Sequence, residues 1–245
     1  MSRTLTYFVS DVHLGLDVSD PQGREARFVA FLRSIPSEET ESLYLLGDIW
    51  DFWYEYRDVV PKGYVDVFAA LTDLIKAGVK VWFFQGNHDV WSYHYFEELG
   101  LRRLEQPYYT RIGEVDFCLG HGDGLGPDQR GYKRLRRIFH SKFLQALFST
   151  LHPWIAFRIG TSWSHHSRLA KSIGYDFKGP EEPLYQFCVS SEAPENTVFI
   201  FGHYHCSTDL ALPGGRRLLL LRDWIETSNW LTFDSSTGMV SRTEV

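Results

Sequence analysis

Cysteine and long apolar runs are both scarce in this 245-residue sequence. The three cysteines, Cys118, Cys188 and Cys206, have no C-x-x-C spacing, which argues against a disulfide framework and a thiolate zinc site and predicts reduced, structural thiols. No segment approaches the ~18 consecutive apolar residues that a membrane-spanning helix requires. The first ten residues lead into a strand-like segment without the apolar core of a secretory signal. These absences predict a cytoplasmic protein.

Acidic residues are absent from one long segment, residues 129–171, although the whole chain has a net charge of −6. This segment holds nine lysines and arginines, so the remaining residues carry a net charge of −15. A confined basic block in an acidic protein predicts a surface for an anionic partner: a phosphorylated ligand, a nucleic acid or a membrane face. The alternative interpretation is a helix face that is simply solvated. The basic residues are Arg130, Lys133, Arg134, Arg136, Arg137, Lys142, Arg158, Arg168 and Lys171.

The order of apolar segments indicates an α/β fold. Residues 5–9, 43–46 and 79–84 are short, mostly apolar and followed by polar clusters, which is typical of strands buried on both faces. Between them, residues 24–33 and 64–77 carry apolar side chains at helical spacing. The first half is therefore predicted to have the element order βαβαβ, and later strand candidates predict two packed sheets. These candidates are residues 111–112, 115–119, 198–201, 216–221 and 230–233.

The basic segment interrupts this pattern with helix-compatible, aromatic sequence. We expect a helical cap at residues 129–171, inserted into a main domain made of residues 1–128 and 172–245. Its apolar residues either line a substrate groove or pack against the main domain, as the apolar face of any amphipathic helix does. The main apolar residues are Phe139, Phe143, Leu144, Leu147, Phe148, Leu151, Trp154, Ile155 and Phe157.

Five short polar motifs each follow a strand candidate. In α/β sheets the carboxyl ends of such strands converge on one crevice, so we expect these side chains to meet. Buried together without partners, the carboxylates, amide and imidazoles would be costly, whereas divalent cations stabilise all three groups in one place. Nitrogen and oxygen donors without cysteine favour Mn²⁺, Fe²⁺ or Zn²⁺, and we expect manganese. The motifs are Asp11-Val-His13, Gly47-Asp48, Gly86-Asn87-His88-Asp89, Gly120-His121-Gly-Asp123 and Gly202-His203-Tyr-His205.

The ordered set of motifs resembles the calcineurin-like metallophosphoesterase superfamily across nearly the whole chain, whereas each motif alone is typical of a turn or cap. The resemblance implies a four-layer α-β-β-α sandwich and two metal ions, with a metal-bridging hydroxide that attacks phosphorus in line. It also implies that His88 donates to a phosphate or leaving oxygen and that Asp89 orients His88. The implied ligands of one metal are Asp11, His13, Asp48 and His205, and those of the other are Asp48, Asn87, His121 and His203, with Asp48 bridging.

Three longer segments resemble the UDP-2,3-diacylglucosamine diphosphatase family of lipid A biosynthesis, which produces UMP and lipid X. They are residues 47–53, 121–126 and 131–140. The resemblance implies a lipid-linked nucleotide substrate and a cap that binds acyl chains. One residue departs from it, because familiar members carry Arg where this chain has His88. The predicted substrate-binding residues are Asp123, Tyr132, Arg136, Ser167, Arg168 and Lys171.

Several other functions stay open at this point. The same metal centre would serve a phosphodiesterase acting on a soluble nucleotide, although such a substrate gives no reason for an aromatic, basic cap. A nuclease is disfavoured because the single basic patch is too confined for a nucleic-acid track. A scaffold that has lost its chemistry is disfavoured by the complete set of expected ligands. The basic, apolar cap also predicts reversible contact with the inner membrane face.

Overall fold

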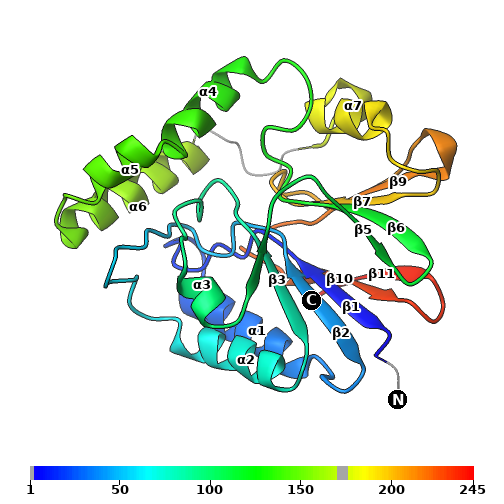
Figure 1. The fold of residues 1–245 in the computed structure, drawn as a ribbon, viewed down its shortest axis with the longest axis horizontal. Coiled ribbons are helices and arrows are strands. Elements are labelled where there is room, and N and C mark those ends of the chain that lie inside the picture. Colours follow the sequence, from blue (N-terminus) through cyan, green and yellow to red (C-terminus); the bar gives the residue numbers. More distant parts are fainter. Residues whose placement is uncertain (1–2, 170–175) are drawn as a thin grey trace.

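Two β-sheets pack face to face, with helices on their outer sides (Figure 1). The computed structural model describes residues 3–169 and 176–245, and in the last helix before the gap it describes side chains up to Ser162. In this part of the chain, no helix is both long enough and apolar enough to cross a membrane.

The first sheet has the strand order β11-β10-β1-β2-β3-β4. Strands β1 to β4 run parallel, and β10 and β11 add an antiparallel edge beside β1. Because β1, β2 and β3 are parallel neighbours, the loops that follow them leave the sheet at the same end. The strands are β1 (Leu5–Val9), β2 (Thr40–Leu45), β3 (Lys80–Phe84), β4 (Arg102–Leu104), β10 (Asn229–Asp234) and β11 (Met239–Glu244).

The second sheet has the order β5-β6-β7-β9-β8. Its three central strands β6, β7 and β9 run parallel, and β5 and β8 are antiparallel edges. The loops after β6, β7 and β9 therefore also leave the sheet at one end. The strands are β5 (Tyr108–Ile112), β6 (Val115–Leu119), β7 (Val198–Phe201), β8 (Thr208–Ala211) and β9 (Arg217–Leu220).

Three apolar clusters separate four layers, which confirms the predicted α/β fold class. One cluster joins the first sheet to α1 and α2, a second fills the space between the sheets, and a third joins the second sheet to α7. Helix α1 begins after Asp20, whose side chain accepts a hydrogen bond from the Gly23 amide. The helices of these layers are α1 (Pro21–Ser34), α2 (Val65–Lys76), α3 (Tyr95–Glu98) and α7 (Pro183–Ser190), with short 3₁₀ turns at Gly179–Glu181 and Pro213–Gly215.

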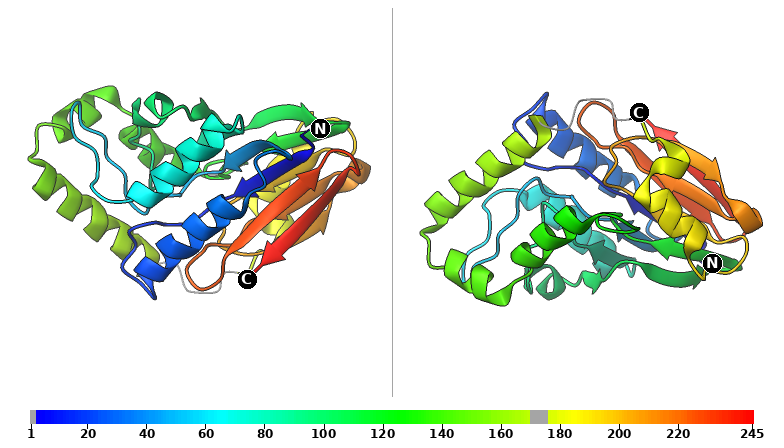
Figure 2. Two further views of the ribbon diagram at one scale, coloured as in Figure 1. Left: turned by 90° about the horizontal axis from the view of Figure 1, so that it is seen from below. Right: turned by 90° about the horizontal axis from the view of Figure 1, so that it is seen from above.

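Three helices stand beyond one end of the sheets (Figures 1 and 2). They are α4 (Arg130–Phe139), α5 (Lys142–Phe148) and α6 (Pro153–Leu169), all within the segment expected to form a cap. Hydrogen bonds join them to the loops after β2 and β3: Tyr54 Oη donates to Gln145 O, and Trp91 Nε1 donates to Phe139 O. We refer to α4, α5 and α6 as the cap helices. The division of the chain into two domains stays a prediction.

Candidate metal centre

The five polar motifs meet at the carboxyl ends of the parallel strands of both sheets. Asp11 and His13 follow β1, Asp48 follows β2, and Asn87 follows β3 in the first sheet. The second sheet contributes residues after β6 and β7. Residues separated by almost two hundred positions thus share one site, because strand direction fixes where each loop emerges. The contributions of the second sheet are His121, His203 and His205.

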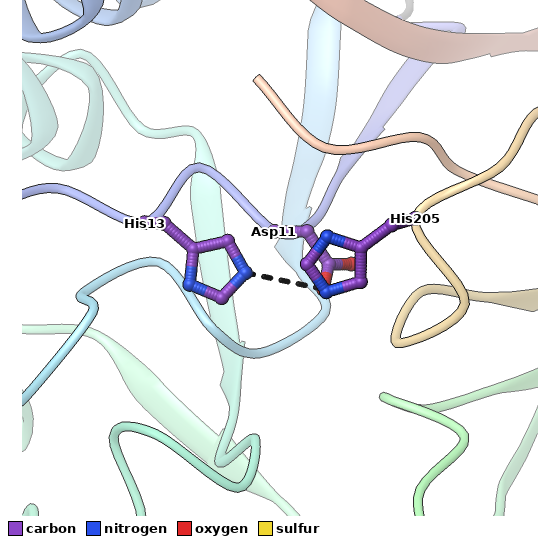
Figure 3. A group of neighbouring side chains, drawn as sticks. All are labelled: Asp11, His13 and His205. Carbon is purple, nitrogen blue, oxygen red and sulfur yellow. Dashed lines mark ion pairs between the residues drawn. The ribbon is translucent and has the colours of Figure 1, made fainter. Parts of the chain in front are cut away.

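One group of side chains forms around Asp11 (Figure 3). Asp11 Oδ1 lies 3.6 Å from His13 Nε2 and 3.6 Å from His205 Nε2. The two imidazole rings stack with their centroids 5.1 Å apart. Asp11 and His13 are fully buried. Three potential ligand atoms therefore face one small volume.

A second group forms around Asp48 and shares that volume. Asp48 Oδ2 lies 3.4 Å from His121 Nε2 and 3.8 Å from His13 Nε2, so it faces both groups. Asn87 Oδ1 is 3.3 Å from His121 Nε2, and the rings of His121 and His203 have centroids 5.1 Å apart. All seven residues expected to bind metal are thus brought together. Asp48 lies between the two groups.

The backbone at this site is strained. A non-glycine residue with a positive φ angle costs of order 1–3 kcal/mol, so such residues persist only where the surroundings hold them. Five of the seven expected ligands have positive φ angles, which aim their side chains into the crevice. They are Asp11 at 53°, His13 at 51°, Asp48 at 51°, His203 at 70° and His205 at 54°.

Glycines leave the space that the carboxylates occupy. A Cβ atom on Gly86 would lie 2.1 Å from Asp48 Oδ1, and one on Gly202 would lie 2.2 Å from Asp11 Oδ2. Real side chains do not approach that closely, so any other residue would push these carboxylates aside. The glycines before Asn87 and His203 are therefore part of the site.

The electrostatic field of the crevice favours positive charge. Burial alone would raise the pKa of both aspartates, but neighbouring imidazoles, His13 for Asp11 and His121 for Asp48, lower each pKa below its ordinary value. Burial would lower the pKa of His121, but Asp48 raises it to about 10. The carboxylates therefore attract whatever positive charge can reach them.

Divalent cations fit this donor set. Asp11 Oδ1 is buried and makes no hydrogen bond to the described residues. Among their ion pairs, none joins Asp11 or Asp48 to a lysine or arginine. A pair of carboxylates, an amide oxygen and imidazoles without thiolate suit Mn²⁺, Fe²⁺ or Zn²⁺.

A cavity of about 850 Å³ extends from this centre to the cap helices. At one end Asn87, His88 and His203 line it, and at the other end its walls are mainly apolar. Its volume lies in the upper part of the range of about 300–1,000 Å³ that is typical of ligand pockets. The apolar walls include Leu135, Ile138, Phe139, Leu144, Leu147 and Phe148.

Three expected substrate-binding residues line this cavity and contact one another. The buried Asp123 accepts through Oδ2 a hydrogen bond of 2.7 Å from Tyr132 Oη, and the same oxygen lies 3.3 Å from Arg136 Nε. Asp123 Oδ1 accepts from Gln106 Nε2 at 2.7 Å. Asp123 therefore ties α4 to the loop that carries His121. The other expected substrate-binding groups, the side chains of Ser167 and Arg168 and the whole of Lys171, lie outside the described residues.

Comparison with known proteins agrees with this geometry. The family model of the calcineurin-like phosphoesterases matches residues 5–207, which is most of the chain and includes every strand-end motif. The chain belongs to this family. Members are metal-dependent hydrolases, so this phosphoesterase is one as well, and divalent metal ions are implied as its cofactors.

Two curated relatives of the phosphoesterase cover nearly its whole length. A UDP-2,3-diacylglucosamine hydrolase from Porphyromonas gingivalis is 33% identical over 259 residues, covering 99% of this chain and 98% of the relative. A UDP-2,3-diacylglucosamine hydrolase from Sodalis glossinidius is 29% identical, covering 96% of each chain. Among solved structures, a dimetal phosphatase from Danio rerio is 13% identical, with a TM-score of 0.46 over 99% of this chain and 98% of that one.

His88 is held differently from our expectation. We predicted that Asp89 orients it, but both carboxylate oxygens of Asp89 accept backbone N–H groups, from Gly86 at 2.7 Å and from Ile49 at 2.9 Å. The ring of His88 instead contacts Asp51, with Nδ1 2.8 Å from the carbonyl oxygen and 3.7 Å from carboxylate Oδ1. Asp89 therefore braces the loops after β2 and β3, and Asp51 orients His88. Burial, followed by the charge of Asp48, raises the pKa of Asp89 to about 7.

Two carboxylates beside the phosphoesterase centre were missed by the sequence reasoning. Asp51 Oδ1 lies 3.4 Å from His13 Nδ1, and Asp223 Oδ2 lies 3.0 Å from His205 Nδ1. Asp51 sits in the polar cluster after β2, so its place next to Asp48 was a usable signal. Asp223 lies after β9 and outside the five motifs, so nothing in the sequence distinguished it from other loop aspartates.

Proposed function

We propose that this phosphoesterase hydrolyses the pyrophosphate of UDP-2,3-diacylglucosamine to UMP and 2,3-diacylglucosamine 1-phosphate, lipid X. The observation that carries the proposal is the 850 Å³ cavity, which joins the candidate metal centre to an apolar wall built by the cap helices. A substrate with a pyrophosphate and two acyl chains has the same division into polar and apolar parts. The names of the two full-length relatives support the same substrate.

The metal ligands are proposed as two sets that share Asp48. When bound, two divalent cations supply an activated water as the nucleophile and neutralise charge on the phosphoryl oxygens. We propose Mn²⁺ as the metal, since the donor set has oxygen and nitrogen atoms alone. Asp11, His13, Asp48 and His205 form one set, and Asp48, Asn87, His121 and His203 form the other.

His88 is the proposed donor to the substrate. A carbonyl oxygen only accepts hydrogen bonds, so the contact of Nδ1 with Asp51 O assigns a proton to Nδ1. Nε2, which lies 3.9 Å from Asp48 Oδ2, then donates when the ring is doubly protonated. A charged imidazole at the cavity surface stabilises a phosphoryl or leaving oxygen, which is the role an arginine has in familiar relatives.

The segment 129–171 is proposed to be the cap that selects the substrate. Arg136 and Tyr132 line the cavity beside the metal centre, where a phosphate or sugar would pass, and Asp123 fixes both side chains. Ser167, Arg168 and Lys171 are proposed as further contacts to the polar part of the substrate.

The direct test is release of UMP from UDP-2,3-diacylglucosamine by the full chain with Mn²⁺. We expect turnover of this lipid to exceed that of a generic aryl phosphodiester and of single-stranded DNA. Turnover of the generic ester alone would favour a soluble phosphodiester as substrate, and DNA cleavage alone would favour a nuclease. The variant Asp48→Ala, assayed in parallel, identifies any contaminating hydrolase because it removes the proposed shared ligand.

The cap is also proposed to contact the inner membrane face. Phe143, Leu147 and Trp154 on α5 and α6 are 75%, 57% and 62% exposed. Arg158 lies over the ring of Trp154 at 4.9 Å, which places a cation beside this apolar surface. Each basic residue near an anionic leaflet contributes about 1 kcal/mol, so reversible attachment requires no anchor.

Co-sedimentation with vesicles that contain anionic phospholipid tests this contact. We expect the wild type to bind at low salt and Trp154→Ser to bind several-fold less. Val65→Ser is the control, because Val65 is also apolar and is 75% exposed but lies on α2, away from the cap (Figure 1). Equal binding by both variants and the wild type would contradict the proposed surface.

A further inference from the structure

A loop outside the segment matched by the family contacts the metal centre. The match ends at residue 207, whereas the loop of residues 222–225 follows β9. In this loop, Asp223 Oδ2 lies 3.0 Å from Nδ1 of His205, whose other nitrogen, Nε2, lies 3.6 Å from Asp11 Oδ1. The His205 ring is thus held by one carboxylate and faces another across the centre.

We propose that Asp223 is a positioning residue that sets the affinity of one of the two cation positions through His205. A carboxylate accepts a hydrogen bond, so this contact assigns the proton of a neutral His205 to Nδ1 and leaves the Nε2 lone pair facing Asp11. That tautomer is the one able to bind a cation there. Carboxylates that hold metal-binding histidines in this way fix the ring and strengthen the ligand.

The loop is held rigidly enough for this role. The fully buried Asn229 accepts from the Arg222 amide at 3.1 Å and donates to the carbonyl oxygens of Arg222 and Asp223. The second carboxylate oxygen of Asp223 accepts from the Ile225 amide at 3.0 Å. Both the backbone and the side chain of Asp223 are therefore fixed before any ligand binds.

The same loop also supports Asp11. The amide of Trp224 donates to the carbonyl oxygen of Asp11 at 3.0 Å, so consecutive loop residues hold two members of one proposed ligand set. In the other set, Nδ1 of His121 contacts a backbone carbonyl, Leu46 O, at 3.0 Å. The loop after β9 therefore acts on the cation position of Asp11 and His205. The cation position beside His121 does not depend on this loop, because the Leu46 carbonyl oxygen contacts His121 Nδ1 instead.

Calorimetric titration of the metal-stripped full chain with Mn²⁺ tests this inference, which rests on the proposed ligand sets. We expect two binding events in the wild type. In Asp223→Ala one event weakens by about 10–100-fold while the other keeps its affinity. Asp223→Asn keeps a hydrogen-bond acceptor without the charge and loses less. The matched control is Glu226→Gln, which removes one negative charge from an exposed position three residues away and leaves both events unchanged.

Three results would overturn the inference. The first is unchanged Mn²⁺ affinity in Asp223→Ala. The second is a loss of both events together with a lower melting temperature of the metal-free protein, which indicates a structural role; Asp223→Asn carries the test if the alanine variant does not fold. The third is a wild type that binds no Mn²⁺, which overturns the proposed metal centre as well. Normal binding by the wild type and by Asp223→Ala leaves the proposed function standing and overturns this inference alone.

Discussion

Asp48 is the residue on which the two groups of the centre depend. Its Oδ2 faces His121, His13 and His88 at 3.4, 3.8 and 3.9 Å, and its Oδ1 accepts from the His88 amide at 2.9 Å. It is 1% exposed, so its charge is little screened by water. A side chain that faces both groups has a larger effect than one that touches a single oxygen of the substrate.

At the residue scale we therefore predict that Asp48→Ala abolishes measurable hydrolysis, whereas His88→Ala lowers kcat by about 10²-fold. The first variant removes a ligand shared by both cations, and the second removes a donor. Steady-state rates with Mn²⁺ provide the measurement. Asp58→Ala is the control, because Asp58 is exposed and forms an ion pair with its exposed neighbour Arg57. Equal, minor losses in the first two variants would contradict these roles.

At the scale of elements, the cap helices depend on a close contact between α6 and the loop after β2. A Cβ atom on Gly160 would lie 2.1 Å from the ring of Phe52, and both residues line the cavity. Phe52 itself packs edge-on against Phe157 and Trp91. A methyl group at this position forces the ring or α6 to move, so the observed packing of α6 on Phe52 requires glycine.

Gly160→Ala is accordingly predicted to displace α6 and reshape the apolar end of the cavity. We expect about 10-fold lower kcat/KM for the diacylated substrate, because a misplaced binding wall costs of order 1.4 kcal/mol, with little change for a generic diester. Thr161→Ala is the matched control, since the neighbouring Thr161 is exposed. Equal losses on both substrates would show that this contact supports the metal centre instead of the substrate.

At the scale of the whole molecule, the centre joins the two sheets. The proposed ligands follow β1, β2 and β3 in one sheet and β6 and β7 in the other, so cations bound there would connect layers that otherwise meet through apolar packing. The unfolded chain does not keep these residues together. Binding therefore stabilises the folded state by mass action.

Metal removal is predicted to lower the melting temperature substantially. At a free Mn²⁺ concentration of about 100 times Kd, each ion contributes about 2.7 kcal/mol, which corresponds to roughly 5–10 °C for a chain of this size. Thermal unfolding with and without a chelator measures the shift, and readdition of Mn²⁺ should restore it. In Asp48→Asn we expect a much smaller response. A wild-type melting temperature that is independent of Mn²⁺ would argue against cation binding between the sheets.

Much of the fold, and most residues of the candidate metal centre, could be predicted from the sequence. Strand β1 was predicted with its observed bounds, and β7 likewise, because buried strands of parallel sheets read as short apolar runs with clear ends. The three chain-order neighbours β1, β2 and β3 placed their motifs at one end of a sheet, and the types of side chain there indicated cations. The edge strands β4, β8 and β11 were not predicted, since half-exposed strands lack a continuous apolar run.

The tertiary structure alone decided which side chain supports which. Asp89 follows His88 in the chain, yet its oxygens meet backbone amides, whereas Asp51 and Asp223 reach the imidazoles from loops after other strands. Neighbouring side chains leave the backbone in different directions, so Asp89 meets the amides of Gly86 and Ile49 while the ring of His88 meets Asp51. Local pattern thus determined the residues that form the centre, and the packing of two sheets determined how each one is held.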